Sequence, residues 1–525
     1  MQAVTMKRWM IISILVALPS YAHADLLFHA LDGADPTGGT AAAAPPTEQQ
    51  NDLIQWAGEP KAVTLPDLLQ LAVQHAPALA SAKLDIAIAE AQIRETWARH
   101  DYRLGAQLQY SKVGSQIFSG IELQASTQAL AEVDISRVLP TGGTVDLRLD
   151  TNYSHTDASA GGIFPESTYW TSDISGSITQ PLLKGYGSAL YDAQERKATL
   201  SHDAAILARR LTALQTISQV VSAYWDLVLA EQQVAITEQS LALARERLRV
   251  TEIQVKGGKV ADAEVPAVQQ IIATREEDVL NGELAVLNAS VALRRAVGMP
   301  IGAGEMGLRV ATDLGTAEGD LDLAGLVQRA FDAAPQLAEL SKQDQSATID
   351  IEVNHNGLLP QLDLALQAGP RGTDSTFHSS VTDALKFDSY QVSGTLTFSR
   401  TLHQYDVNYR DRELRANREK VRVTVADVRA QLAQGMATAV AQMELAKRRV
   451  VLSQRAIELA KENIRIETDR FNLGRSTNFD VLNRLEEQRQ AELRRAQALI
   501  DWHKAQTSVQ TLTGDLLAKF GVSVD

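Results

Sequence analysis

The sequence predicts a mainly α-helical fold with a smaller β part that lies in a membrane. Three observations predict this class. Residues 65–109 and 323–367 repeat one order of apolar and polar residues at a constant offset of 258. Two runs of about 70 residues each have the apolar period of a helix, and alternating strand patterns occur only in two islands. We therefore expect tandem long-helix hairpins forming an α-helical barrel, with strands that contribute to a transmembrane β-barrel.

Matching residues in the two halves establish the duplication. The aligned residues are Ala76, Pro77, Leu79, Leu104 and Leu108 in the first half, and Ala334, Pro335, Leu337, Leu362 and Leu366 in the second. Each half then runs in the order helix, strands, long helix, helix. An internal repeat of this size determines the architecture before any single residue is considered.

The segments along the chain follow from these patterns. We expect a secretory signal peptide at 1–24, because Lys7 and Arg8 precede an apolar stretch and the small-residue site Ala22-His23-Ala24. Residues 25–62 are rich in Gly, Ala, Pro and Thr, which predicts a flexible N-terminal extension. The other assignments are a first repeat at 63–300 with strands at about 103–180, a connecting equatorial segment at 301–320, a second repeat at 321–516 with strands at about 361–399, and a C-terminal tail at 517–525.

Composition excludes several kinds of site and partner. The chain has no cysteine, which excludes disulfides, thiolate metal sites and acylation of an N-terminal cysteine. Removal of Lys7 and Arg8 with the signal leaves 48 basic side chains against 64 acidic ones, a formal charge of −16, so we expect no nucleic-acid partner. No later run reaches the roughly 18 apolar residues of a membrane helix. An exported chain of this kind belongs in the periplasm, outside the cell, or in an outer-membrane barrel.

The first long helix, expected from about Lys184 to Lys256, has two apolar stripes on neighbouring faces. One stripe is Leu207, Leu211, Leu214, Ser218, Val221, Trp225 and Val228, and the other is Ile217, Val220, Tyr224, Leu227, Glu231 and Val234. Two stripes indicate a helix packed between neighbours on both sides, as in a closed ring of helices. A helix inside a thick bundle would give the same pattern. At about 1.5 Å per residue, about 70 residues extend roughly 100 Å.

Each long helix ends at a turn that contains glycine, and a shorter helix then returns. The turns are Val255-Lys256-Gly257-Gly258-Lys259 and Phe471-Asn472-Leu473-Gly474-Arg475-Ser476-Thr477. Glycine adopts positive φ at little cost, which stopping and reversing a helix requires. The return helices are expected at about 261–297 and 478–516, so the chain forms two helical hairpins.

The strand islands suit a membrane, because their alternating segments are flanked by aromatic residues. Alternation is clear at 173–178, 362–367 and 391–398, and the flanking aromatics are Tyr110, Tyr153, Tyr169, Trp170, Tyr390 and Phe398. The first island is 40 residues longer than the second (72 steps from Leu104 to Gly176 against 32 from Leu362 to Gly394) and holds two further runs at 129–138 and 144–153. The chain therefore supplies four or six strands. Neither number closes a transmembrane barrel, so we expect a cyclic homo-oligomer.

Together these features resemble the TolC family of outer-membrane efflux proteins over nearly the whole mature chain. The residues that carry the resemblance are the two Ala-Pro-x-Leu helices, the junction Thr179-Gln-Pro-Leu-Leu-Lys-Gly-Tyr-Gly187, and Arg470-Phe-Asn-Leu-Gly-Arg-Ser-Thr-Asn-Phe-Asp-Val-Leu482. The resemblance implies a homotrimer in the outer membrane of a Gram-negative bacterium, with a lipid-contacting barrel and a helical tunnel through the periplasm. It also implies docking of a periplasmic adaptor (membrane fusion) protein and an inner-membrane pump or ABC exporter, as in efflux or type I secretion.

The same resemblance implies a gate at the periplasmic tips. Its candidate residues are Asp480, Asn483, Glu264 and Phe471, and the candidate adaptor-contact residues are Gly257, Gly258, Lys259, Gly474, Arg475 and Ser476. Asn483 stands where family members often have a second acid, and Phe471 where they have a tyrosine. Asp480 also has a structural interpretation, since a carboxylate is stabilised in the first turn of a helix.

No sequence pattern indicates an enzyme, a cofactor or a metal. Gly185-Tyr-Gly187 lacks the third glycine and the βαβ frame of a phosphate loop, and the ten histidines show no ligand spacing. We expect a passive exit duct gated at its tip. The alternative is a coiled-coil structural or adhesive envelope protein anchored by a small barrel, whose stalk would not double back.

Overall fold

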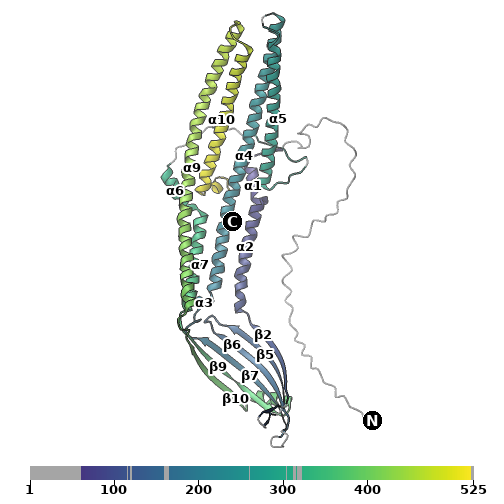
Figure 1. The fold of residues 1–525 in the computed structure, drawn as a ribbon, viewed down its shortest axis with the longest axis vertical. Helices are drawn as coiled ribbons and strands as arrows, with labels where there is room; N and C mark the ends of the chain where they lie inside the picture. Colours follow the sequence, from purple (N-terminus) through teal and green to yellow (C-terminus); the bar gives the residue numbers. More distant parts are fainter. Residues whose placement is uncertain are drawn as a thin grey trace, which may run out of the picture. The chain divides into compact units, whose positions relative to one another are not determined.

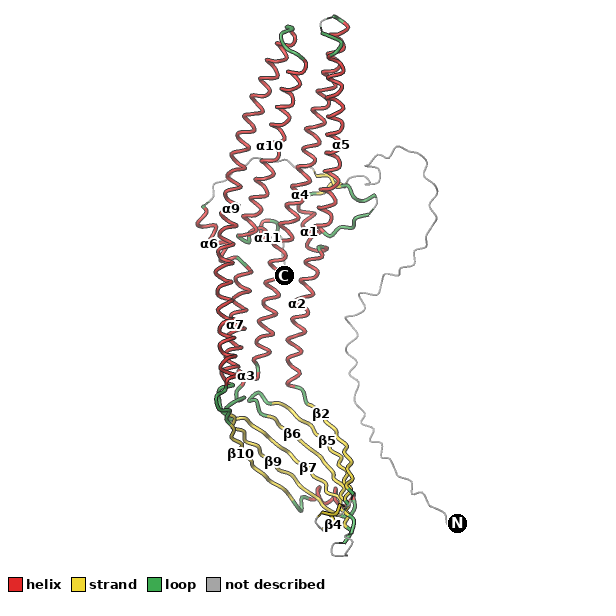
Figure 2. Tube along the Cα trace, in the orientation of Figure 1, coloured by secondary structure: helices red, strands yellow, loops and turns green. Residues whose placement is uncertain are grey.

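The structure is a computed structural model that describes residues 61–114, 116–118, 121–123, 125–158, 165–258, 260–302, 304–310, 315 and 322–521. These residues belong to one compact unit of the chain. Long helices form one end of this unit and a sheet forms the other (Figures 1 and 2). The expected signal peptide, residues 25–60 of the expected extension, and Lys259 lie outside the described residues.

The two repeats begin with equivalent helices. The first repeat has α1 (Leu65–His75) and α2 (Pro77–Thr96), and the second has α6 (Leu323–Ala333) and α7 (Pro335–Asn356), each pair starting 258 residues apart. Pro77 and Pro335 both occupy the start of their helix, where the N–H that proline lacks would have no helical partner. A short 3₁₀ turn, η2 (Trp97–His100), follows α2 and leads into the sheet.

The predicted helical hairpins are present. They consist of α4 (Ala193–Lys256) with α5 (Glu264–Val297), and of α9 (Tyr405–Asn472) with α10 (Asn478–Leu512). With 64 and 68 residues, α4 and α9 are each about 100 Å long.

Two predicted helix ends are wrong. The first long helix does not begin near Lys184, because Gly185 and Gly187 have φ of 90° and 113°, and the short helix α3 (Ser188–Tyr191) comes first. The last return helix stops at Leu512 rather than at Leu516, because Gly514 has φ of 74°. Helix α11 (Asp515–Lys519) then crosses the boundary drawn for the C-terminal tail.

Apart from the middle of α4, where α1 and α11 also pack, the helices form a wall one helix thick (Figure 1). Near the sheet, α4 contacts α2 on one side and α7 on the other, and α7 contacts α9; toward the tips, α4 contacts α5 and α10, and α10 contacts α9. Helices α4 and α9 run through both parts. These contacts confirm that the two apolar stripes of α4 serve neighbours on both sides, and they contradict the thick-bundle interpretation.

The largest apolar core surrounds the middle of α4. It joins buried residues of several elements, among them Leu68 of α1, Ile217 and Leu227 of α4, Leu293 of α5 and Leu516 of α11. Two short strands lie here, β1 (Lys61–Val63) and β8 (Leu308–Val310), and they pair in parallel. Strand β1 thus begins inside the range assigned to the extension. Glu231 accepts a 3.0 Å hydrogen bond from the N–H of Val310, and burial raises the pKa of this carboxyl.

The main sheet has six antiparallel strands in the order β10-β9-β7-β6-β5-β2. They are β2 (Arg103–Val113), β5 (Ser126–Val138), β6 (Thr144–Thr156), β7 (Ser167–Pro181), β9 (Gln361–Asp374) and β10 (Tyr390–Ser399). A separate ribbon, β3 (Gln116–Phe118) with β4 (Ile121–Leu123), lies between β2 and β5 along the chain, and helix α8 (Phe377–Lys386) lies between β9 and β10. Of the two strand counts that the sequence allowed, the structure has six.

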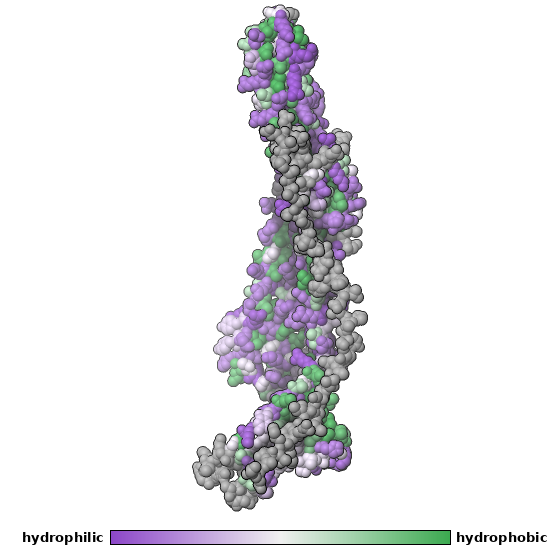
Figure 3. Space-filling view, turned by 90° about the vertical axis from the view of Figure 1, so that its right-hand side faces the viewer, coloured by the Kyte–Doolittle hydropathy of each residue, from purple (hydrophilic) through white to green (hydrophobic). Residues whose placement is uncertain are grey.

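The register gives the sheet one apolar and one polar face. The apolar face presents Leu104, Leu108, Val133, Ile135, Leu147, Leu149, Ile178, Leu366, Val392, Leu396 and Phe398 to the surroundings. Figure 3 shows hydrophobic side chains gathered at the lower end of the molecule, where the sheet lies. Of the six predicted interfacial aromatics, Tyr169 pairs with Ser154 and lies on the polar face, whereas the other five lie on the apolar face.

Both edges of the described sheet are long and unpaired. Strand β2 forms one edge with 11 residues, and β10 forms the other with 10. Strand β2 runs away from the helices and β10 returns toward them, so the two edges have opposite directions (Figure 1). An edge in lipid leaves backbone N–H and C=O groups without partners, and β10 of one copy has the direction needed for antiparallel pairing with β2 of another.

Candidate functional site

The polar face of the sheet carries a row of charges in register. Across five strands the paired residues are Gln107, Glu132, Asp150, Asp173 and Arg371. Arg371 donates two hydrogen bonds to Asp173, at 2.8 and 3.2 Å. Three adjacent carboxylates in one row give this face a negative character.

The next row toward the helices is neutral and leaves that acidic excess in place. It pairs Asp134 with Arg148, and Arg148 also lies 3.2 Å from Glu132 in the first row. The two rows together hold four carboxylates and two guanidinium groups. A surface with an acidic excess favours cations over anions in the water beside it.

The first hairpin tip is a short turn closed by backbone hydrogen bonds. The N–H of Gly257 donates to the carbonyl of Ile253, and that of Gly258 to Val255. Gly258 has φ of 70°, whereas Gly257 has φ of −83° and is conformationally ordinary. Helix α5 then starts at Glu264 without a side-chain cap. Residues 257 and 258 are exposed, as an adaptor contact would require.

The second hairpin tip is stabilised further by side chains. Gly474 has φ of 73°, and the N–H of Arg475 donates to the carbonyl of Arg470 across the turn. Thr477 and Asp480 form a reciprocal capping box, with Asp480 N–H donating to Thr477 Oγ1 at 3.3 Å and Thr477 N–H donating to Asp480 Oδ2 at 3.1 Å. The hydroxyl and backbone N–H of Thr477 hold the pKa of Asp480 below its ordinary value.

A buried polar cluster links the two hairpins near their tips. Arg247 of α4 donates from Nε to Oδ1 of Asn478 at 2.8 Å, and its guanidinium lies 4.0 Å from the centre of the Phe471 ring. The hydroxyl of Thr251 is 3.3 Å from the same Asn478 oxygen. All four side chains are buried, and burial lowers the pKa of Arg247. We call Arg247, Thr251, Phe471 and Asn478 the tip link.

A second connection joins α5 to α10. Arg275 of α5 donates to Glu486 of α10, which also accepts from Arg489 at 2.8 and 2.9 Å and from Gln490 at 2.9 Å. Burial alone would raise the pKa of Glu486, but these hydrogen bonds and the charges of Arg489 and Arg275 outweigh it and lower the pKa to about 2. The carboxylate is therefore ionised throughout the physiological range.

The predicted gate residues do not form a single cluster within one chain. Phe471 is buried in the tip link, whereas Asp480 and Asn483 are exposed one helical turn apart on α10. Glu264 is half-buried in the first turn of α5. Asp480 has the capping role that the sequence allowed, and its side chain remains exposed.

The predicted adaptor-contact residues of the second tip also differ in their surroundings. Gly474 and Arg475 are exposed, whereas the hydroxyl of Ser476 points to the buried Glu467, which Arg470 also contacts at 3.4 Å. Beside them, Leu473 and Phe479 are 71% and 64% exposed. The tip thus presents apolar surface around a polar turn.

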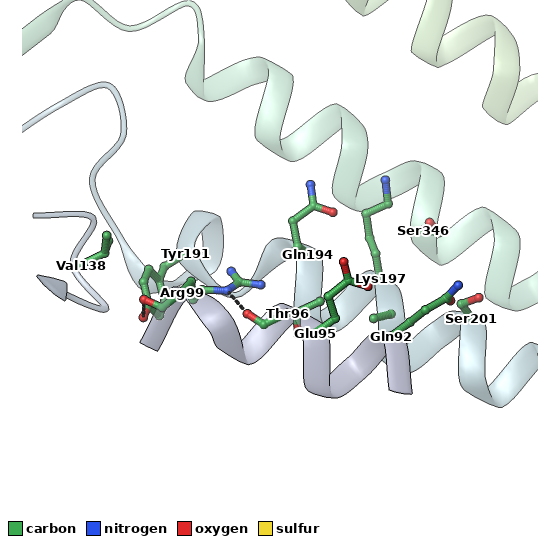
Figure 4. A pocket seen from close by; sticks show the side chains of 11 residues that line it. Gln92, Glu95, Thr96, Arg99, Val138, Tyr191, Gln194, Lys197, Ser201 and Ser346 are labelled. Atoms are coloured by element: carbon green, nitrogen blue, oxygen red, sulfur yellow. Dashed lines mark hydrogen bonds between the residues drawn. The ribbon is translucent and has the colours of Figure 1, made fainter. Parts of the chain in front are cut away.

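An open hollow of about 880 Å³ lies where the helices meet the sheet (Figure 4). Its lining includes Gln92 and Arg99 from the first repeat, Gln194 and Lys197 from α4, and Ser346 from α7. Arg99 donates to the carbonyl of Thr96 at 2.9 Å, and Lys197 lies 2.6 Å from Asp350. Because its cationic groups already pair with the surrounding wall, we assign this hollow no ligand.

Two features are absent from the described part of the chain. No three of its His, Asp or Glu side chains are placed to hold a metal ion. None of its helices has the length and apolarity needed to cross a membrane.

Sequence reasoning missed Arg247, Thr251 and Glu486, which connect helices far apart in the chain. Arg247 and Asn478 are separated by 231 residues, so no local pattern indicates their contact. A weak signal existed for Asn478 alone, since it follows the capping Thr477 in the motif already noted at the second tip. The exposed Leu473 and Phe479 belong to the same motif, but they were not among the residues predicted to contact an adaptor.

Comparisons with known proteins agree with this geometry. The model of the outer membrane efflux protein family matches residues 124–299 and 326–515, one match in each repeat. No curated protein matches the chain.

Solved structures share its fold at low sequence identity. The outer membrane protein VceC of Vibrio cholerae is 13% identical, with 86% of this chain and 96% of VceC covered and a TM-score of 0.60. The CmeC outer membrane channel of Campylobacter jejuni is 12% identical, with 90% and 94% covered and a TM-score of 0.60. The open-state MtrE outer membrane channel of Neisseria gonorrhoeae is 14% identical, with 86% and 88% covered and a TM-score of 0.60. These likenesses confirm the predicted fold class.

Proposed function

This chain belongs to the outer membrane efflux protein family, and it is therefore an outer-membrane efflux channel rather than an enzyme. We propose that it works as the passive exit duct of a tripartite efflux or type I secretion system. The observation that carries the proposal is the pairing of a six-stranded sheet that has two open edges with a helical wall one helix thick. Neither surface encloses a bore alone. Copies arranged about an axis would enclose one continuous water-filled passage.

The functional oligomer in this proposal is a homotrimer. Six strands from each of three copies give eighteen, which lies within the range of closed outer-membrane barrels. The even number per chain makes every junction between copies antiparallel, as in the interior of the sheet. The apolar face contacts outer-membrane lipid, and the charged rows face the passage, where three copies contribute twelve carboxylates and six guanidinium groups.

The tandem repeats at 63–300 and 321–516, with a connecting segment between them, are our proposed domain division. It is supported by the 258-residue offset of the paired helices α1 and α6 and of α2 and α7. We likewise propose that residues 1–24 are a signal peptide, which the expected route to the outer membrane requires.

The periplasmic gate is proposed to lie at the hairpin tips, with Asp480 and Asn483 lining it and Glu264 nearby. Three copies would place rings of carboxylates and amides one helical turn apart. The tip link and the Arg275–Glu486 pair then hold the two hairpins of one copy in the closed arrangement. Phe471 contributes from within the wall, as a platform under Arg247, rather than from the passage.

The exposed tip turns are the proposed contact for a periplasmic adaptor, which brings an inner-membrane pump or ABC exporter to the duct. Gly257, Gly258, Gly474 and Arg475 lie on this surface, and Leu473 and Phe479 add apolar area typical of the centre of a protein interface. Lys259 and Ser476 complete the set chosen from the sequence.

Single-channel recording in planar bilayers tests the duct and its gate together. We expect the purified oligomer to conduct ions, and Asp480→Ala to reduce cation selectivity or block by divalent cations. Asp411→Ala is the control, because Asp411 lies on α9 near the sheet. A protein that forms oligomers but never conducts would overturn the duct, and unchanged selectivity in Asp480→Ala would remove Asp480 from the gate.

Cysteine crosslinking tests the docking surface. The chain has no cysteine of its own, so single cysteines at Gly258 and Arg475 report one site each. Crosslinks to a co-expressed adaptor are expected from both, and none from the control Arg410→Cys near the sheet. The structural or adhesive alternative predicts no conductance and no crosslink. It is also disfavoured by the return of both long helices as hairpins.

A further inference from the structure

Helix α8, in the connection between β9 and β10, packs closely against the sheet. It starts at the cap Thr376, whose side chain accepts from the N–H of Ser379, and it stops at Phe387, where φ is 60°. Ser380 and Ala384 face the sheet and are fully buried. A Cβ at Gly372 of β9 would lie 1.9 Å from the carbonyl oxygen of Ser380, so only glycine at residue 372 permits α8 to pack this closely on β9.

Helix α8 packs on the apolar face of the sheet. Gly372 pairs with Ser172 of β7, and the Ser172 hydroxyl lies 2.9 Å from that of Ser380. In the alternation of β7, Ser172 shares its face with Trp170 and Ile174, which pair with Tyr153 and Leu149 of β6. The ring of Trp170 is also 5.4 Å from that of Phe377 on α8. Helix α8 therefore lies outside the proposed bore, on the side of the lipid-facing residues.

The helix leaves an apolar ridge uncovered. Phe377, Val381 and Leu385 follow one another at intervals of four residues, and Phe377 and Leu385 are 46% and 60% exposed. Two exposed aromatic residues follow the helix along the chain, Phe387 and then Tyr390 on the apolar face of β10. The opposite side of α8 is polar, with Lys386 3.1 Å from Asp383. This division of a helix into apolar and charged sides is typical of helices that lie in a membrane interface.

We propose that α8 is an interfacial helix that inserts Phe377, Val381, Leu385 and Phe387 into the lipid surface around the outer rim of the sheet. The inference rests on the proposed membrane location of the sheet and adds a second, non-strand contact with lipid. Lipid is the occupant because Phe377 of the ridge contacts Trp170 on the apolar face of the strands. The hydroxyls of Thr151, Ser172 and Ser380 beneath the helix indicate that the hydrocarbon band has ended at this level. Tyr153 and Trp170 at the same level are residues enriched at membrane interfaces.

One consequence concerns the mouth of the duct. The β9–β10 connection is held on the outside of the sheet by Gly372 and Ser380, so this connection does not close the passage. The depth of the sheet in the membrane is then set both by its apolar band and by α8.

Site-directed fluorescence tests the inference on the full-length oligomer in phosphatidylcholine vesicles. Because the chain has no cysteine, single variants Leu385→Cys and Phe377→Cys can carry an environment-sensitive label, with Lys386→Cys as the matched control on the polar side. Leu147→Cys, on the apolar face of β6, reports whether the sheet is in the membrane. Quenching is measured with nitroxide-labelled lipid and with aqueous iodide.

We expect lipid nitroxide to quench labels at residues 377 and 385 at least about threefold more than the label at residue 386, and iodide to show the reverse order. Equal access of iodide to residues 385 and 386, with residue 147 still quenched by lipid, would overturn the proposal and leave the membrane sheet intact. Loss of lipid quenching at residue 147 as well would overturn the membrane sheet itself. A label at residue 385 shielded from both quenchers and crosslinked to a second copy would show that protein covers the ridge, which also refutes it.

Discussion

Each repeat begins with a helix pair and ends with a long-helix hairpin, but the repeats contribute different shares of the main sheet. Strands β9 and β10 form the whole contribution of the second repeat, whereas β5 and β6 are inserted between β2 and β7 of the first. A hairpin can be inserted into a sheet without disturbing the faces of its neighbours, because the side-chain period is two and the pairing repeats from strand to strand. The helical wall offers no such freedom, since α4 packs against neighbours on both sides and α9 packs against α7 near the sheet and against α10 toward the tips. The largest difference between the repeats is therefore in the sheet.

The tips show a second difference between the repeats. The first tip depends on backbone hydrogen bonds around Gly258, whereas the second adds a capping box and supplies Phe471 and Asn478 to the tip link. The second hairpin thus carries most of the side-chain chemistry at this end, and the first contributes Arg247 and Thr251.

Deletion of residues 126–156 is expected to have the largest effect on the structure, because it removes β5 and β6 from the barrel and makes the two repeats equal in strand number. Strand β2 would then pair directly with β7, with side-chain parity preserved. Three copies would form twelve strands, and since barrel diameter grows roughly in proportion to strand number, the barrel should narrow to about two thirds. Electron cryomicroscopy of the oligomer measures this. An unchanged diameter would show that β5 and β6 are not part of the closed barrel.

Replacement of Arg247 tests whether the second tip depends on the first. Arg247→Ala removes the donor to Asn478 and the cation over Phe471, which should lower the free energy of local opening by about 1–3 kcal/mol. Hydrogen exchange of peptides covering 245–256 and 478–485 should become about tenfold faster or more. Arg249→Ala is the matched control, since Arg249 is exposed and pairs with Glu246 within α4. Equal acceleration by both variants would contradict the role of the tip link.

Glycine replacement separates the two turns by backbone conformation. Gly474→Ala forces an alanine to φ near 73° and should lower the free energy of local unfolding at the second tip by about 1 kcal/mol. Gly257→Ala keeps φ near −83° and should change the corresponding free energy at the first tip little. Nothing lies within 4 Å of a Cβ at Gly474, so the cost is conformational rather than steric. Hydrogen exchange at each tip measures it, and equal protection in the two variants would argue against this account.

A change of pH within the physiological range should have the smallest effect on the stability of the contact between α5 and α10. The folded-state pKa of Glu486 is about 2, below its ordinary value of 4.5, so its contribution to stability is complete above about pH 4.5 and is lost as the pH falls toward 2. The rate of amide hydrogen exchange in α5, corrected for intrinsic rates, should be unchanged from pH 8 to pH 5 and should rise below pH 4. Glu486→Gln should abolish that dependence, and Glu462→Gln, on the exposed side of α9, should not. A midpoint near pH 6 would exclude Glu486 as its source.

The sequence revealed the parts of the fold that repeat or alternate. The Ala-Pro-x-Leu helices and the two hairpins follow from the spacing of apolar residues and from glycine, which act locally. The same spacing located the strand islands but left four and six strands open, and the structure has six. Helix α8 was missed although Phe377, Val381 and Leu385 have helical spacing, because ten residues between strands look like an ordinary loop. The pairing of β1 with β8 and the contact of Arg247 with Asn478 join distant segments, and single-residue patterns carry no information about such contacts.

The grip of the apolar core on the middle of α4 has a mechanical consequence. Residues Ile217 to Val228 pack against α1, α5, β8 and α11, near the middle of this 64-residue helix. In the gate that we propose, the part that moves is the length of α4 and α5 beyond this core. Bending there leaves the core and the strands on its other side in place, so opening the inner aperture requires no motion of the membrane anchor.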